Sequence, residues 1–130
     1  MTVTTVKIES LLTNLRKSQL TGISFDPESL ALTLEFTLGD EVKVIKMQFF
    51  QLIHLVISKE IDENDGCFFV GDVSLTPVAD GGKEILSSLL YRFRERDGTV
   101  ATYPQQSLFH FHLEGGVCIE AVCGEWELLS

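Results

Sequence analysis

The sequence predicts one α+β domain, residues 1–130, built on a mostly antiparallel sheet of about six to seven strands that can curl, with two helices packed on one face. Several segments alternate apolar and polar residues with the period of a strand. Two other segments repeat apolar residues with the period of a helix. The length of 130 residues suits one hydrophobic core and is too short for two ordinary domains.

The composition indicates a folded protein with a hydrophobic core, located in a reducing compartment of the cell. The hydrophobic fraction is 45%, and nine phenylalanines supply the bulk that one core requires. A run of about 18 apolar residues, as a membrane helix needs, does not occur, and the first residues do not resemble a signal peptide. Three cysteines without a C-x-x-C spacing favour free, mostly buried thiols. The sequence therefore predicts a soluble cytoplasmic protein.

The net charge of −9 limits the partners that the surface can attract. An acidic surface repels phosphate backbones, which argues against nucleic-acid binding, and suits docking onto a basic protein. All charged residues from 114 to 130 are glutamates, so this end is the expected contact. The candidate partner-binding residues are Glu114, Glu125, Trp126 and Glu127. Trp126 is expected to close the edge of the core, and the alternative is an exposed binding anchor.

The first predicted helix lies near the N-terminus and is expected to pack against the sheet. Its apolar stripe, at spacings i, i+3, i+4 and i+7, consists of Ile8, Leu11, Leu12 and Leu15. Thr4 or Thr5 is expected to cap the start of this helix, and Gly22 to lie just beyond its end.

A second helix is expected from Asp80 to about Arg94. Its apolar stripe consists of Ile85, Leu86, Leu89, Leu90 and Phe93. Three arginines at its end, Arg92, Arg94 and Arg96, form a candidate anion-binding group. The alternative is that they are solvated and simply complement the helix dipole.

Three strands are expected directly after the first predicted helix. Residues 23–25 and 30–38 are joined by Asp26-Pro27-Glu28-Ser29, a type I turn sequence with Asp first and Pro second. Residues 42–49 form the next strand. Its inward set changes from Val42 and Val44 to Ile45, Met47 and Phe49, which predicts a bulge.

Residues 49–61 fit either a helix or a strand, and the segment that follows favours the strand. Asn64-Asp65-Gly66 is a good three-residue hairpin loop. With that loop the apolar positions match across the two arms: Ile61 with Phe69, Ile57 with Val73, and Leu55 with Leu75. A helix would not explain this match.

A C-terminal hairpin is expected from Leu108 to Leu128, and its loop length decides which residues share a face. A two-residue Gly115-Gly116 loop would pair Phe111 with Glu120 and mix charges with aromatic rings. A three-residue loop starting at Glu114 pairs Phe111 with Ile119 and makes one face apolar. It also requires a positive φ at Gly116. The sequence therefore favours three residues.

In the three-residue register the other face of the hairpin carries chemistry-bearing side chains. His112 lies opposite Cys118, and His110 lies opposite Glu120. Imidazole, thiol and carboxylate groups bind transition metals such as zinc or transfer protons, so these four residues are the candidate metal or acid–base site. The alternative is a solvated outer face of a half-buried hairpin.

No specific catalytic motif is present, so an enzyme is not the expected class. The primary hypothesis is a small acidic interaction or regulatory protein, such as an inhibitor, that binds a basic partner without a cofactor. The alternatives are the metal or acid–base site, and a small-molecule pocket between the curled sheet and the helices. An exposed edge strand would also permit a homodimer.

Overall fold

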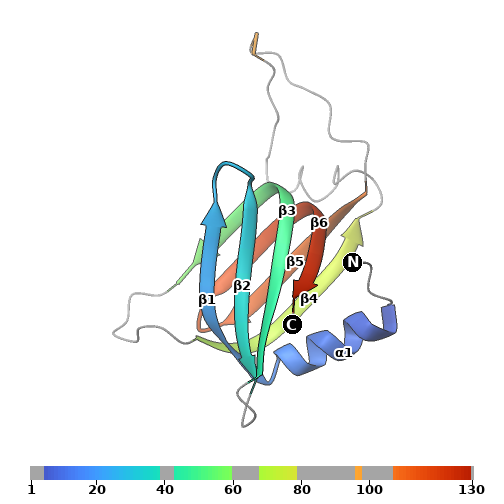
Figure 1. Ribbon diagram of the computed structural model, residues 1–130, viewed down its shortest axis with the longest axis vertical. Helices are drawn as coiled ribbons and strands as arrows, with labels where there is room; N and C mark the ends of the chain where they lie inside the picture. Colours follow the sequence, from blue (N-terminus) through green and yellow to red (C-terminus); the bar gives the residue numbers. More distant parts are fainter. Residues whose placement is uncertain (1–4, 39–42, 60–67, 79–95, 98–106, 130) are drawn as a thin grey trace.

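The computed structural model describes residues 5–38, 43–59, 68–78, 96–97 and 107–129. Among these residues, six antiparallel strands form a closed barrel in the order β1-β2-β3-β6-β5-β4, with one helix beside it (Figure 1). The elements are α1 (Thr5–Leu15), β1 (Ser18–Asp26), β2 (Ala31–Leu38), β3 (Lys43–Ser58), β4 (Phe68–Val78), β5 (Leu108–Gly115) and β6 (Cys118–Leu129). The antiparallel sheet is confirmed. The second predicted helix, residues 80–94, lies outside the described residues.

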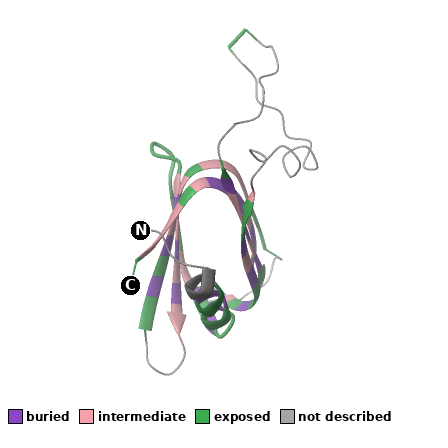
Figure 2. Cartoon of the chain, turned by 90° about the vertical axis from the view of Figure 1, so that its right-hand side faces the viewer, coloured by how far each residue is buried: buried purple, intermediate pink, exposed green. Residues whose placement is uncertain are grey.

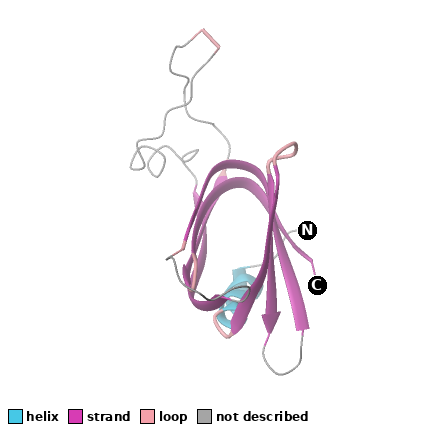
Figure 3. Cartoon of the chain, turned by 90° about the vertical axis from the view of Figure 1, so that its left-hand side faces the viewer, coloured by secondary structure: helices cyan, strands magenta, loops and turns pink. Residues whose placement is uncertain are grey.

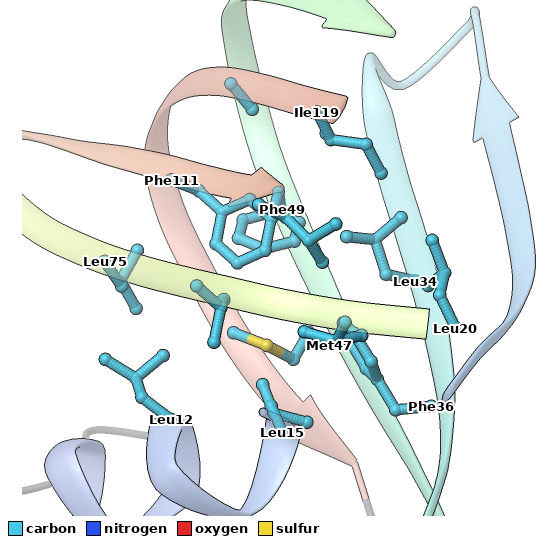
Figure 4. Packing of buried hydrophobic residues seen from close by; sticks show 14 of the residues in the cluster. Leu12, Leu15, Leu20, Leu34, Phe36, Met47, Phe49, Leu75, Phe111 and Ile119 are labelled. Carbon is cyan, nitrogen blue, oxygen red and sulfur yellow. The ribbon is translucent and has the colours of Figure 1, made fainter. Parts of the chain in front are cut away.

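The helix α1 covers one end of the barrel instead of one face of a sheet (Figure 2). Leu11, Leu12 and Leu15 are buried, and Leu12 and Leu15 point toward the barrel interior (Figure 4). The predicted stripe is therefore confirmed for these three leucines. The helix ends at Leu15, where the hydroxyl of Ser18 donates to the Leu15 carbonyl at 2.6 Å. Gly22 was expected beyond the helix, but it lies within β1.

The hairpin of β1 and β2 forms through the predicted turn. The carboxylate of Asp26 accepts hydrogen bonds from the Glu28 backbone N–H at 3.0 Å and the Ser29 hydroxyl at 2.9 Å. These bonds lower the pKa of the Asp26 carboxyl below its usual value, because both donors favour the ionised form. The pairing runs from Asp26 opposite Ala31 to Ser18 opposite Leu38.

The long strand β3 confirms that residues 49–58 are a strand, but its predicted pairing is wrong. β3 pairs with β2 and β6, whereas β4 pairs with β5 and β1. Apolar alternation matches any strand of the same period, so the local loop signal did not identify the true neighbour. The expected bulge in the first half of β3 is also absent from Lys43 to Phe49. The register shift lies between Leu52 and His54.

The barrel interior is filled by side chains from every strand (Figure 4). Phe36, Phe49 and Phe111 are fully buried, and the ring centroids of Phe49 and Phe111 lie 4.8 Å apart. The view along the barrel shows the sheet curving back on itself (Figure 3). Because opposite strands cover each other's apolar faces, the sheet does not need the two-helix layer that the sequence suggested.

Candidate functional site

The register of the β5–β6 hairpin places the candidate site on the outside of the barrel. Phe111 pairs with Ala121 and Leu113 with Ile119, so the predicted register is wrong by two residues. A shift of two leaves each side chain on its predicted face, because the strand period is two. Gly116 does not adopt the expected positive φ. Its backbone N–H instead donates to the carbonyl of Phe69 at 2.9 Å.

Glu120 lies between two histidines on this outer surface. Its Oε1 lies 3.3 Å from Nε2 of His54, and its Oε2 lies 3.3 Å from Nε2 of His110. The side chains are 12% exposed for His54, 21% for His110 and 29% for Glu120. These three residues, contributed by β3, β5 and β6, are called the His–Glu–His cluster below.

The strand register explains why the three side chains meet. Both His54 and His110 are paired with Val122, from opposite sides of β6. Glu120 is two residues before Val122 and so projects from the same face of the same strand. Val122 is fully buried although it does not belong to the barrel core, which places a dehydrated apolar floor beside the polar groups.

The other predicted ligands are not in this cluster. His112 is opposite Glu120 in register instead of Cys118, and its Nε2 lies 3.4 Å from Oε1 of Glu114. Cys118 is exposed and pairs with Ser58 of β3. Among the residues that the structure describes, no three His, Cys, Asp or Glu side chains are grouped as metal ligands.

The cluster has the donor and acceptor pattern of an acid–base site. An imidazole with its proton on Nε2 donates to an ionised carboxylate, and Glu120 has one oxygen for each ring. The arrangement can therefore hold protons at two positions next to one negative charge.

A groove between α1 and β6 is the second candidate site, with a volume of about 470 Å³. The helix contacts β1, β2 and β4, and it leaves this space in front of β6. The groove is lined by Glu9 and Leu12 of α1, Ser74, Leu75, Thr76 and Pro77 of β4, Phe109 of β5 and Trp126 of β6. The lining is mainly apolar and contains one carboxylate and no cation.

Within the part of the chain that the structure describes, the end of β6 beside this groove has an open edge. Its pairing with β5 ends at Cys123, whereas its pairing with β3 continues to Leu129. Within the described residues, the segment 124–129 therefore has a neighbour on one side only. Trp126 is half-buried and packs against the core, as expected, while it also lines the groove. Glu125 is exposed, and Glu127 is half-buried.

The remaining predicted residues do not join either site. Arg92 and Arg94 lie outside the described residues, and Arg96 is exposed in a turn. Cys123 is buried, as the sequence predicted for the thiols, whereas Cys118 is exposed. Burial raises the pKa of the Cys123 thiol to about 12, because the thiolate would lose its hydration.

Among the described residues of the His–Glu–His cluster, sequence reasoning did not include His54 as a candidate. The sequence placed His54 on the polar face of a strand. Glu120, which His54 contacts, lies 66 residues later in the sequence. The local pattern carries no signal of that pairing.

No protein-family model and no curated protein matches the chain. The described helix is too short and too polar to cross a membrane.

Proposed function

We propose that the protein is a small interaction protein that binds an extended, basic segment of a partner along the open edge of β6. The observation that carries this proposal is the apolar groove at Trp126, which lies beside a strand edge without a described neighbour and is bordered by glutamates. An extended peptide that adds to such an edge gains main-chain hydrogen bonds, and the pockets beside the edge select its side chains.

The two faces of β6 specify the partner's side-chain pattern. Trp126 and Leu128 pack toward the core, whereas Glu125 and Glu127 alternate with them on the other face. A strand added at this edge would place every second side chain over the groove and the others beside the glutamates. The expected segment therefore alternates apolar residues with lysine or arginine.

The single tryptophan provides a direct test, because Trp126 lines the groove and no other tryptophan emits. A short blocked peptide of alternating lysine and valine should change the Trp126 fluorescence in a saturable way. The apparent affinity should fall as salt increases, since the attraction to the glutamates is screened. A peptide in which glutamate replaces lysine should give no saturable change.

Two variants separate this surface from general charge attraction. Glu127→Lys should weaken peptide binding by about tenfold or more, because it reverses a charge next to the edge. Glu28→Lys makes the same charge change in the distant β1–β2 turn and should bind as the wild type does. Equal weakening by both variants would contradict a specific site on β6.

A second candidate function is proton exchange or metal binding at the His–Glu–His cluster. The acid–base form is favoured, because the two Nε2 atoms contact separate oxygens of Glu120. Titration with zinc, followed by calorimetry, distinguishes the two forms. Stoichiometric binding that is lost in His54→Ala would support the metal form, and absence of binding would leave the acid–base form.

A further inference from the structure

The strand β5 presents two histidines on the outer surface of the barrel, and the His–Glu–His cluster includes only one of them. His110 and His112 are two residues apart, so both side chains project from the same face of the strand. Their rings are nearly parallel, with an interplanar angle of 11° and centroids 6.4 Å apart. Imidazole nitrogen is a preferred ligand of zinc and of other divalent transition metal ions. The strand therefore offers two such nitrogens side by side.

Glu120 of the neighbouring strand β6 lies beside both imidazoles. It is paired with His112 in the strand register, where opposed Cβ atoms lie about 5 Å apart. Its Oε2 lies 3.3 Å from Nε2 of His110. Two ligand atoms that bind one tetrahedral zinc ion at about 2.0 to 2.1 Å are also about 3.3 Å apart. The separation of the carboxylate oxygen and the first imidazole nitrogen therefore already suits a shared metal ion.

A small rotation of the second imidazole completes the donor set. Nε2 of His112 lies 3.4 Å from Oε1 of Glu114, so this ring contacts a carboxylate of its own strand. Two imidazoles that bind one zinc ion through Nε2 have ring centroids about 5 Å apart, so the observed 6.4 Å must decrease by about 1 Å. The side chain of His112 is 34% exposed, which leaves it room to rotate and lets an ion approach from solvent.

We propose that His110, His112 and Glu120 bind a divalent transition metal ion such as zinc on the outer surface of β5 and β6. Two histidines and one glutamate are a donor set of zinc sites that keep a fourth position open for water. His54 is a positioning residue here, because its Nε2 contacts the other oxygen of Glu120 at 3.3 Å and orients the carboxylate. Of the ligands predicted from the sequence, only Cys118 is left out.

Calorimetric titration of the full chain with Zn²⁺ tests this site. The background is the Cys67→Ser, Cys118→Ser protein, because thiolates also bind zinc. We expect one ion per chain, and His112→Ala should abolish this one-to-one binding in the same concentration range. Glu114→Gln is the matched control on the same strand. It should bind zinc at least as tightly as the background protein, because it removes the carboxylate that competes for His112.

His54→Ala distinguishes this site from a metal ion held by the His–Glu–His cluster. One ion per chain should still bind, about tenfold more weakly, because only a partner that orients a ligand is lost. Absence of zinc binding in the background protein, undiminished binding in His112→Ala, or loss of one-to-one binding in His54→Ala or Glu114→Gln overturns the proposal. The peptide surface proposed on β6 uses residues 124–129, so either proposal can fail alone.

Discussion

At the scale of single residues, Glu120 joins three strands on the outer surface of the barrel. It contacts two imidazoles from two neighbouring strands, so one carboxylate links β3, β6 and β5. Burying a carboxylate without hydrogen-bond donors costs free energy, and two N–H donors beside it offset part of that cost. We therefore expect the cluster to contribute to stability, whether or not it also transfers protons.

Glu120→Gln tests this role. A glutamine keeps one carbonyl oxygen for one ring and turns an amide N–H toward the other, so this second ring keeps a hydrogen bond only by changing its tautomer, and both rings lose a charged acceptor. We expect the free energy of unfolding in urea at neutral pH to fall by about 1 kcal/mol. Glu28→Gln on the exposed turn is the matched control and should change it by less than about 0.5 kcal/mol. Equal values for both variants would show that the His–Glu–His contacts add nothing.

The two described cysteines should differ in reactivity. With Cys67→Ser as background, a thiol reagent at mildly alkaline pH should modify one thiol of the folded chain rapidly, and Cys118→Ser should remove this fast phase. Cys123 should react only on unfolding, because it is buried and its pKa is raised to about 12.

The raised pKa of Cys123 also gives a sign for the pH dependence of stability. The folded-state pKa of Cys123 lies above the usual 9.0. The contribution of the buried thiol to the free energy of unfolding is therefore complete below pH 9.0 and is lost as the pH rises toward about 12. Rapid modification of Cys123 in the folded chain would contradict both statements.

The sequence predicted part of the cluster at this scale. His110 and Glu120 were expected on one face, and an even register error left them there. His54 could not be found, because its place depends on the pairing of β3 with β6 over a large sequence separation. Cys118 was expected beside His112, and the shift of two residues removed that contact.

At the scale of elements, the strand β3 contains an irregularity in its middle. β3 shifts register between Leu52 and His54, and Gln51 there has a φ of 56°. A non-glycine residue with positive φ costs free energy, which the pairing on both sides of the bend must offset. The backbone N–H of Leu52 also donates to the Leu30 carbonyl at 3.3 Å, which fixes the β1–β2 turn against this bend.

The close approach of β4 to the β5–β6 hairpin gives a prediction for Gly115. A Cβ atom added at Gly115 would lie 2.1 Å from the carbonyl oxygen of Phe69, so the backbone must move. Gly115→Ala should lower the free energy of unfolding by about 2 to 3 kcal/mol. Gly22→Ala should cost less, because its nearest atom is the Glu35 Cβ at 3.1 Å. A Gly115→Ala protein as stable as the wild type would argue against this approach.

Local signals were reliable for these elements where the partner is adjacent in sequence. The Asp26-Pro27 turn and the leucine stripe of α1 depend on neighbouring residues, and both are present. The pairing of β3 was missed because period-two alternation identifies a strand but not its neighbour. The expected Asn64-Asp65-Gly66 loop lies outside the described residues.

At the scale of the whole molecule, closure of the sheet explains why function is expected on the outside. Phe36, Phe49 and Phe111 fill the interior, so a partner must use the outer faces, the ends or the open edges. The acidic composition then favours a basic partner, and the groove at Trp126 gives it an apolar contact. The net charge predicts a basic partner, and this stays a prediction. No local pattern indicates that, among the described residues, the pairing of β6 with β5 ends at Cys123.

Backbone amide chemical shifts during titration of the labelled protein with the lysine–valine peptide test the central claim most directly. We expect the largest changes at residues 124–129, at the Trp126 indole N–H and at residues 74–77 of β4, because a strand added to β6 would contact these groups. Changes centred on His54 and His110, or no change at saturating peptide, would contradict the proposal that the edge of β6 is the binding surface.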